Sequence, residues 1–209
     1  MDLSNPAMET LAAAGAASAD RTGDVAPAAE AIWIERARGG DEAAFGALVD
    51  RYRDRAYGLA MRIVRVPAEA EEVAQDAFVR VWRALPGFRG DAAFSTWLYR
   101  IVVRRALDRA AVLKTRRQRE AEVEMAADLP DERADGSGAE ALWRSRRLER
   151  LMGGLTEVQR IVVTLYYYED RSVEDVSEVL GMPENTVKTH LRRAREALRS
   201  AWLRDQGAP

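Results

Sequence analysis

The sequence predicts an all-α protein with two helical domains that a flexible acidic linker joins. Three observations support this fold class. Apolar residues recur every three to four positions from about residue 29 onward, and capping residues stand where these stripes begin and end. An acidic segment with few large apolar residues separates the two helical parts. The predicted parts are an Ala-rich disordered tail at 1–28, an N-terminal domain at 29–113, a linker at 114–138, a C-terminal helix-turn-helix domain at 139–204 and a tail at 205–209.

The N-terminal domain begins with two predicted helices. Ile32 and Ile34 mark a short helix that Gly39 and Gly40 end, and Asp41 then caps a longer helix. The apolar residues of the longer helix recur on one face, which we expect to be buried: Phe45, Leu48, Val49, Tyr52, Leu59 and Ile63.

A third helix opens at Pro67, since proline suits the first turn of a helix. Its wide apolar stripe consists of Val73, Ala74, Ala77, Phe78, Val81, Trp82 and Leu85. Near its start lies a compact acidic patch made of Glu69, Glu71, Glu72, Gln75 and Asp76. Acids at this end complement the helix dipole, and they equally suit a docking site for a basic partner, so the residues alone leave both interpretations open.

A loop with aromatic residues follows, because Pro86 and Gly87 break the helical pattern. Ser95 is expected to begin the next helix, which turns into a strongly basic rod. Aromatic rings beside an Arg-rich helix suit single-stranded nucleic acid, since rings stack on unpaired bases and arginine neutralises the backbone. Phe94 and Trp97 equally suit the hydrophobic core, and the residues alone do not decide between the two.

The C-terminal domain contains two short helices around a tight turn, within residues 171–195. Ser172 and Asp175 form a capping-box pattern, Gly181 fits a left-handed residue at a helix end, and Pro183 suits the first turn of the second helix. The second helix should bury one face, made of Val187, Leu191, Ala194 and Leu198.

The opposite face of this second helix is polar and basic. Residues 181–204 hold six Lys or Arg against two Glu, a net charge of +4. Asn and Arg can bond base edges in the major groove while Lys, Arg and Thr hold phosphates, so the pattern predicts DNA recognition. The alternative is an ordinary helical hairpin whose charges are solvated. His190, the only histidine, suggests a packed or phosphate-facing ring rather than a metal ligand.

Composition restricts the function classes. The 209 residues carry a net charge of −2 and no cysteine, which excludes disulfides and thiolate metal sites and fits a cytoplasmic location. No stretch approaches the length of a membrane span, and the N-terminus lacks the pattern of a signal peptide. We predict no metal site, no cofactor and no catalytic residue, because the chain lacks a phosphate-binding glycine loop or a framed acid pair. The near-neutral total hides a net +7 at 100–119 and −7 at 120–140.

Four blocks of the sequence carry a family resemblance. They are GDEAAFGALVDRYRDRAYGLA, PAEAEEVAQDAFVRVWRAL, FRGDAAFSTWLYRI and LTEVQRIVVTLYYYEDRSVEDVSEVLGMPENTVKTHLRRAR. In this order and spacing, over residues 30–203, the chain resembles an extracytoplasmic-function (ECF, group IV) sigma factor of the sigma-70 family of bacterial RNA polymerase.

The resemblance implies three binding surfaces. Core polymerase would dock through its largest subunit, beta-prime, on Glu69, Glu71, Glu72, Gln75 and Asp76. The minus-10 promoter element would be captured and melted by Phe88, Arg89, Gly90, Asp91, Ser95, Thr96, Trp97, Arg100 and Arg104. The minus-35 element would be recognised by Glu184, Asn185, Thr186, Lys188, Thr189, Arg192, Arg193 and Arg195. The C-terminal domain would also contact the flap of the beta subunit, and relatives are commonly held inactive by an anti-sigma factor.

The base preference and one competing hypothesis remain open at this point. Arg104 stands where many family members have Asn, so base preference at the melting region does not carry over. The competing hypothesis is a free-standing helix-turn-helix regulator that binds duplex DNA alone. The acidic patch and the aromatic loop discriminate, because such a regulator would need neither.

Overall fold

The structure is a computed structural model, and it describes residues 27–123 and 151–206. All regular structure in these two ranges is helical, which confirms the predicted fold class. The predicted tail at 1–28 lies outside the described residues except at its end, and so do residues 124–150, which include most of the linker. None of the helices in the described ranges has the length and apolarity needed to cross a bilayer.

The first two helices, α2 (Pro27–Arg38) and α3 (Glu42–Val64), meet at the predicted cap. The Asp41 side chain accepts a hydrogen bond from the Ala44 amide at 3.0 Å, which satisfies one of the free N–H groups of the first turn. At its other end α3 closes on Arg65, whose φ of 59° is left-handed. Ile32 is 57% exposed, so the face of α2 that carries it is not part of the core.

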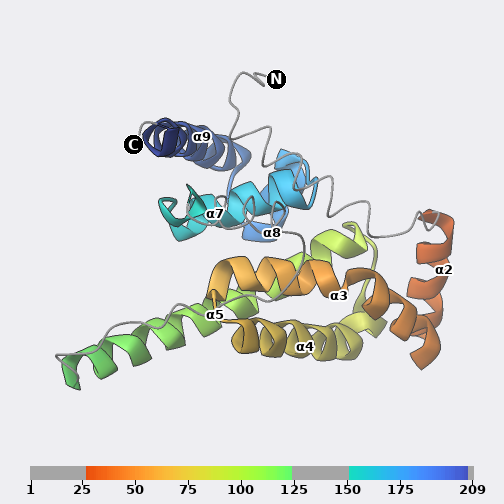
Figure 1. The fold of residues 1–209 in the computed structure, drawn as a ribbon. Coiled ribbons are helices and arrows are strands. Elements are labelled where there is room, and N and C mark those ends of the chain that lie inside the picture. Colours follow the sequence, from red (N-terminus) through yellow and green to blue (C-terminus); the bar gives the residue numbers. More distant parts are fainter. Residues whose placement is uncertain (1–26, 124–150, 207–209) are drawn as a thin grey trace.

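Helices α4 (Pro67–Ala84) and α5 (Phe94–Val123) complete the N-terminal half, with a 3-10 turn η1 (Leu85–Gly87) after α4. Helix α5 begins one residue before Ser95 and continues past residue 113, where the sequence analysis placed the domain end. Residues 114–119 contain no Gly or Pro and are mostly good helix formers, so nothing there stops the helix. In Figure 1 this last part of α5 extends beyond the other helices.

The C-terminal half contains α7 (Glu157–Val163), a π-helical turn η2 (Thr164–Tyr168), α8 (Val173–Leu180) and α9 (Glu184–Gln206). The predicted capping box of Ser172 and Asp175 is present, and Gly181 has the predicted left-handed conformation with φ 62°. Pro183 lies just before the first residue of α9, and its carbonyl accepts hydrogen bonds from the next turn.

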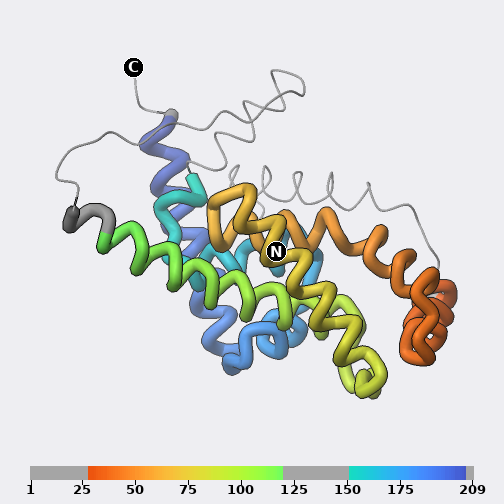
Figure 2. The backbone as a smooth tube through the Cα atoms, turned by 90° about the horizontal axis from the view of Figure 1, so that it is seen from below, coloured from red at the N-terminus to blue at the C-terminus, as the bar shows by residue number. Residues whose placement is uncertain are grey.

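The two halves pack on one another through a shared core. One cluster of buried residues runs from α3, α4 and α5 into α7, η2 and α8, and it includes Leu165, Val176 and Val179. Helix α8 packs against α5, and α7 packs against α3. Figures 1 and 2 show α3, α4 and α5 side by side, with α4 on the side of α5 away from α8. A second cluster, with Leu155, Ala194 and Leu198, belongs to the C-terminal half alone.

A buried polar contact joins the two halves within this packing. The Tyr99 hydroxyl donates a hydrogen bond to Glu169 Oε2 at 2.6 Å, and the two residues are 0% and 4% exposed. The π-helical turn precedes Glu169, whose amide bonds to the Thr164 carbonyl five residues back. Tyr168 and Glu169 are both buried.

Burial raises the pKa of the Glu169 carboxyl above its ordinary value, and the Tyr99 hydrogen bond together with nearby arginines only partly opposes the rise. Because the pKa is raised on folding, the contribution of this group to stability is complete below the unfolded-state pKa near 4.5 and is lost as pH rises through the folded-state pKa.

We therefore expect Glu169→Gln, which keeps an acceptor for Tyr99, to gain stability relative to the wild type as pH rises. The measurement is the free energy of unfolding by urea between about pH 4 and pH 7. Taking the difference in the free energy of unfolding between variant and wild type removes the contributions of the other titrating groups. Glu157→Gln, at an exposed position of α7, controls for the loss of a carboxyl group. A pH-independent difference for Glu169→Gln would contradict the prediction.

Candidate functional site

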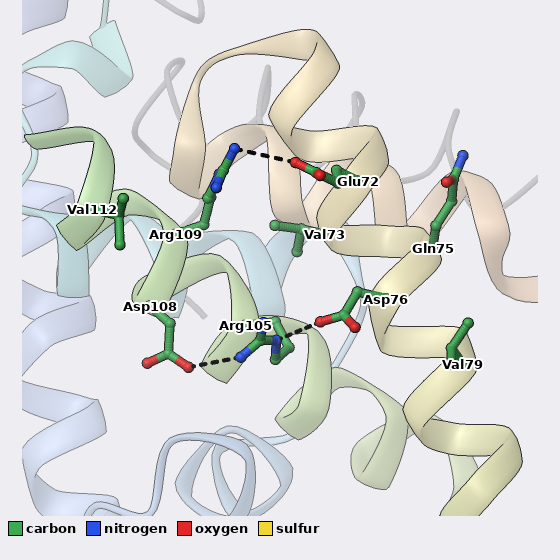
Figure 3. A pocket seen from close by; sticks show the side chains of 9 residues that line it. All are labelled: Glu72, Val73, Gln75, Asp76, Val79, Arg105, Asp108, Arg109 and Val112. Atoms are coloured by element: carbon green, nitrogen blue, oxygen red, sulfur yellow. Dashed lines mark hydrogen bonds and ion pairs between the residues drawn. The ribbon is translucent and has the colours of Figure 1, made fainter. Parts of the chain in front are cut away.

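The predicted acidic patch lies along the groove between α4 and α5, where arginines of α5 meet it. Arg109 pairs with Glu69 and, at 3.2 Å, with Glu72, and Arg105 pairs with Asp76 at 2.7 Å. Figure 3 shows Glu72 and Asp76 of α4 facing Arg109 and Arg105 of α5 across the groove. The acids are therefore part of a charge network between two helices, and the patch is less negative than its sequence suggests.

The members of the patch differ in their surroundings. Glu71, Glu72 and Gln75 are exposed, whereas Glu69 and Asp76 are half-buried. Partial burial raises the pKa of Asp76, but hydrogen bonds from Arg80 and Arg105 offset this and hold it below its usual value. The exposed members are accessible to a partner, although Glu72 also pairs with Arg109, while Glu69 and Asp76 mainly hold α4 and α5 together.

The groove also has apolar walls, which sequence reasoning missed. It has a volume of about 630 Å³, and the side chains of Val79 and Val112 line it while remaining 46% and 57% exposed. Arg105, Arg109 and Val112 follow one another along α5 at spacings of four and three. That spacing was a signal for a shared helix face, but the sequence did not show that this face meets α4.

The aromatic residues of the loop form one ring cluster at the start of α5. Phe94 is 3% exposed and contacts Tyr52, so it belongs to the core. Phe88 and Trp97 are half-buried, with ring centroids 4.8 Å apart, and both rings contact Phe94. The cluster thus has a buried base, Phe94, and two partly exposed rings.

The loop residues between these rings are solvent-exposed. Arg89 and Asp91 form an ion pair at 3.1 Å with side chains 82% and 75% exposed, and Gly90 has φ 78°, a conformation that favours glycine. The exposed loop and the two half-buried rings lie next to each other, as a surface for unpaired bases requires.

The remaining predicted minus-10 residues on α5 divide into two groups. Arg104 is exposed. In contrast, Ser95 and Thr96 are buried at 6% and 0% exposure because the C-terminal half covers them, and Arg100 donates a hydrogen bond to the Glu178 carbonyl at 3.0 Å. The structure therefore does not bring all nine predicted minus-10 residues to one accessible surface.

The predicted recognition face on α9 is accessible. Of its eight residues, seven are exposed and Thr189 is half-buried. Lys188 and Arg192 make ion pairs with Glu184 and Glu196 within the same helix, at 2.9 and 2.7 Å. Arg195 instead donates to the Tyr167 hydroxyl at 2.8 Å. Exposed pairs of this kind are weak, so the basic groups can exchange them for DNA contacts.

The helix-turn-helix with an exposed basic helix, beside a helical domain with an aromatic loop and a charged groove, is the architecture of a DNA-binding protein. Two family models match the chain: "Sigma-70 region 2" at residues 48–118 and "Sigma-70, region 4" at residues 145–198. Together with the relatives described next, they show that the chain belongs to the extracytoplasmic-function sigma factors of the sigma-70 family.

Curated relatives match most of the chain. The RNA polymerase sigma-H factor of Pseudomonas aeruginosa is 37% identical over 80% of this chain and 91% of its own length. The ECF RNA polymerase sigma factor SigW of Bacillus subtilis is 36% identical, covering 82% of this chain and 95% of the relative. The ECF RNA polymerase sigma-E factor of Escherichia coli K12 is 34% identical, covering 80% and 91%.

Two solved structures share the fold. CnrH, in complex with the cytosolic domain of CnrY, aligns with a TM-score of 0.64 at 26% identity over 86% of this chain and 99% of CnrH. RpoE of Bartonella quintana, in complex with the anti-sigma factor NepR, aligns with a TM-score of 0.59 at 19% identity over 76% and 96%, which supports the fold alone.

The function follows from family membership. The chain is a sigma factor for transcription initiation, which binds core RNA polymerase, recognises minus-35 and minus-10 promoter elements and promotes DNA melting; it is not an enzyme. The region 2 match covers α4, the aromatic loop and most of α5, the parts that a regulator of duplex DNA alone would not need. The hypothesis of a free-standing regulator is therefore set aside.

The ring cluster generates a prediction about which aromatic residues support the fold. Phe94→Ala should lower the free energy of unfolding by about 3–5 kcal/mol, because it leaves a cavity in the core. Trp97→Ala removes a ring that is partly in solvent, so it should lower the free energy of unfolding by less. Urea unfolding of both variants measures the difference. A Trp97→Ala variant as unstable as Phe94→Ala would show that Trp97 is a core residue.

Proposed function

We propose that three separate surfaces of this sigma factor perform core docking, strand capture and duplex recognition. The exposed part of the α4/α5 groove, with Glu71, Glu72 and Gln75, contacts the clamp helices of the beta-prime subunit. The observation that supports this most is the combination of exposed acids with the exposed Val79 and Val112, because protein interfaces commonly join an apolar centre to a polar rim.

Strand capture is assigned to the loop and the first turns of α5. Phe88 and Trp97 offer partly exposed rings for unstacked minus-10 bases, and Arg89 and Arg104 offer exposed charge for the backbone. Ser95, Thr96 and Arg100 belong to the same surface, although the C-terminal half contacts them in this structure.

Duplex recognition is assigned to the first turns of α9. Asn185, Lys188 and Arg192 lie on the exposed side of the helix, opposite the buried Val187 and Leu191. Side chains near the N-terminus of such a helix reach base edges in the major groove. The C-terminal half is also proposed to contact the flap of the beta subunit.

An anti-sigma factor and a cytoplasmic location complete the proposal. The structure of CnrH, which this chain resembles at a TM-score of 0.64, contains the cytosolic domain of CnrY, and a protein of that kind is the proposed regulator of this chain. A cytoplasmic location follows from the proposed binding to polymerase and promoter DNA.

The core-docking assignment is tested by Glu71→Lys together with Glu72→Lys. Both side chains are exposed, so the double variant should fold normally while its affinity for core polymerase falls at least about tenfold, since reversed charges oppose a complementary partner. Asp50→Lys with Asp54→Lys makes the same charge change on α3 and is the matched control. Binding is measured by titration of labelled protein with core enzyme, and promoter-dependent run-off transcription gives the functional result. Equal binding by both double variants would refute the assignment.

The minus-35 assignment is tested by Arg192→Ala, with Arg204→Ala at the far end of α9 as control. If Arg192 contacts a base, the variant should weaken binding to the cognate duplex by about 1–3 kcal/mol and relax specificity at one base pair. If Arg192 contacts phosphate instead, binding should weaken equally on all sequences and the salt slope should fall by about 1. Fluorescence anisotropy across salt concentrations separates these results. If neither the affinity nor the salt slope changes, Arg192 is not part of the interface.

A further inference from the structure

Arg195 differs from its neighbours on the exposed face of α9 in the kind of partner that it has. Lys188 and Arg192 each pair with a glutamate of the same helix. Arg195 instead donates its Nε hydrogen to the Tyr167 hydroxyl at 2.8 Å, and its guanidinium lies 6.0 Å from the centroid of that ring. No carboxylate pairs with Arg195 within the two ranges that the structure describes.

Tyr167 is held in place by the fold rather than by α9. It belongs to the π-helical turn η2, 28 positions before Arg195 in the sequence. Its half-buried ring packs against both hydrophobic clusters and makes an edge contact with the ring of Tyr166, with centroids 4.9 Å apart. The Tyr167 hydroxyl is therefore a fixed point at the surface, to which the end of the long Arg195 side chain is attached.

A hydroxyl holds an arginine in a different way from a carboxylate. A carboxylate cancels the positive charge and must be displaced before a phosphate can bind, whereas a hydroxyl accepts a hydrogen bond and leaves the charge in place. Arginine has five N–H groups, so the bond from Nε to Tyr167 leaves the others for a phosphate. A side chain that is ordered beforehand also loses less conformational entropy on binding. Arg195 is thus ordered and still fully charged in the free protein.

The position of Arg195 along α9 indicates which part of the DNA it meets. Arg195 is exposed and lies about one turn beyond Arg192, further from the N-terminus of the helix. In a recognition helix the N-terminal residues contact base edges, and residues nearer the C-terminal end contact the sugar–phosphate backbone. The expected ligand of Arg195 is therefore a phosphate oxygen of the duplex, which an ordered guanidinium binds well.

We propose that Tyr167 is a positioning residue for duplex recognition, which directs Arg195 at a backbone phosphate of the minus-35 duplex. The inference rests on the proposed function of α9. Tyr167 acts through Arg195, so its contribution to DNA binding disappears when Arg195 is removed. Because a phosphate contact carries no base information, the pair should raise affinity on every sequence alike.

The first test compares Tyr167→Phe with Tyr166→Phe. Both changes keep the ring and remove one hydroxyl from a half-buried residue of η2, and the Tyr166 hydroxyl has no hydrogen bond among the described residues. We expect Tyr167→Phe to weaken binding of the full chain to a labelled minus-35 duplex about twofold to fivefold, from the energy of one hydrogen bond. A scrambled duplex of the same length should lose the same factor, and Tyr166→Phe should match the wild type. Equal affinities of the two variants, or tighter binding by Tyr167→Phe, would overturn the proposal.

The second test is a double-mutant cycle with Arg195→Ala, measured by fluorescence anisotropy across salt concentrations. Arg195→Ala should weaken binding to all sequences and lower the salt slope by about 1, as the loss of one phosphate contact does. Tyr167→Phe should then cause no further loss in the Arg195→Ala background, because residues that act as a unit are not additive. Circular dichroism shows that each variant is folded at the temperature of the titration. If the two losses multiply instead, Tyr167 does not act through Arg195 and the proposal is wrong.

Failure of the positioning role and failure of the α9 assignment give different results. If Arg192→Ala weakens duplex binding while Arg195→Ala and Tyr167→Phe leave it unchanged, α9 is the duplex surface and the positioning role alone is wrong. If none of the three variants changes the affinity or the salt slope, α9 is not the duplex surface and both proposals fall. A purely structural bond would lower the free energy of unfolding of Tyr167→Phe and leave DNA binding unchanged, which also contradicts the positioning role.

Discussion

The buried hydrogen bond from the Tyr99 hydroxyl to the Glu169 carboxylate is the constraint on which the relation of the two halves depends. A carboxylate removed from water is costly unless hydrogen bonds and nearby positive charge stabilise it. Tyr99 lies in the second turn of α5, so Glu169 is satisfied when the C-terminal half sits over the start of that helix. In the same arrangement Asp175 and Glu178 lie near Thr96 and Arg100.

Helix α5 consequently serves three neighbours along its length. Its first turns contact the C-terminal half, its middle packs in the core with α3 and α4, and Arg105 and Arg109 pair with the acids of α4. A residue on this helix cannot be assigned to DNA or to polymerase from its chemistry alone, because the neighbours compete for the same charged groups. Glu69 and Asp76 illustrate this, since they support the packing of α4 on α5 more than they extend the docking surface.

Features set by local chemistry were predictable from the sequence, and contacts between distant segments were not. Asp41, Ser172 and Gly181 cap helices as predicted, because a cap depends on residues within one turn. Thr96 and Asp175 are separated by 79 positions in the sequence. The sequence already explains each residue locally, Thr96 by its place at the start of a helix and Asp175 by its capping box, so nothing in it indicated that the two side chains meet. Helix α5 continues to Val123, into the segment that was predicted as the start of the linker, because residues 114–119 contain no Gly or Pro that would stop a helix.

The contact between the halves is uneven in strength. At its outer edge Arg100 and Glu178 are 50% and 42% exposed, so solvent and salt weaken their pair. At its inner edge Tyr99 and Glu169 are buried beside a continuous apolar cluster, where solvent and salt do not reach them. The outer edge, at Arg100, is therefore the weaker part of the contact. The buried part is the stronger one, since breaking the Tyr99 hydrogen bond in place would leave the carboxylate of Glu169 buried without its donor.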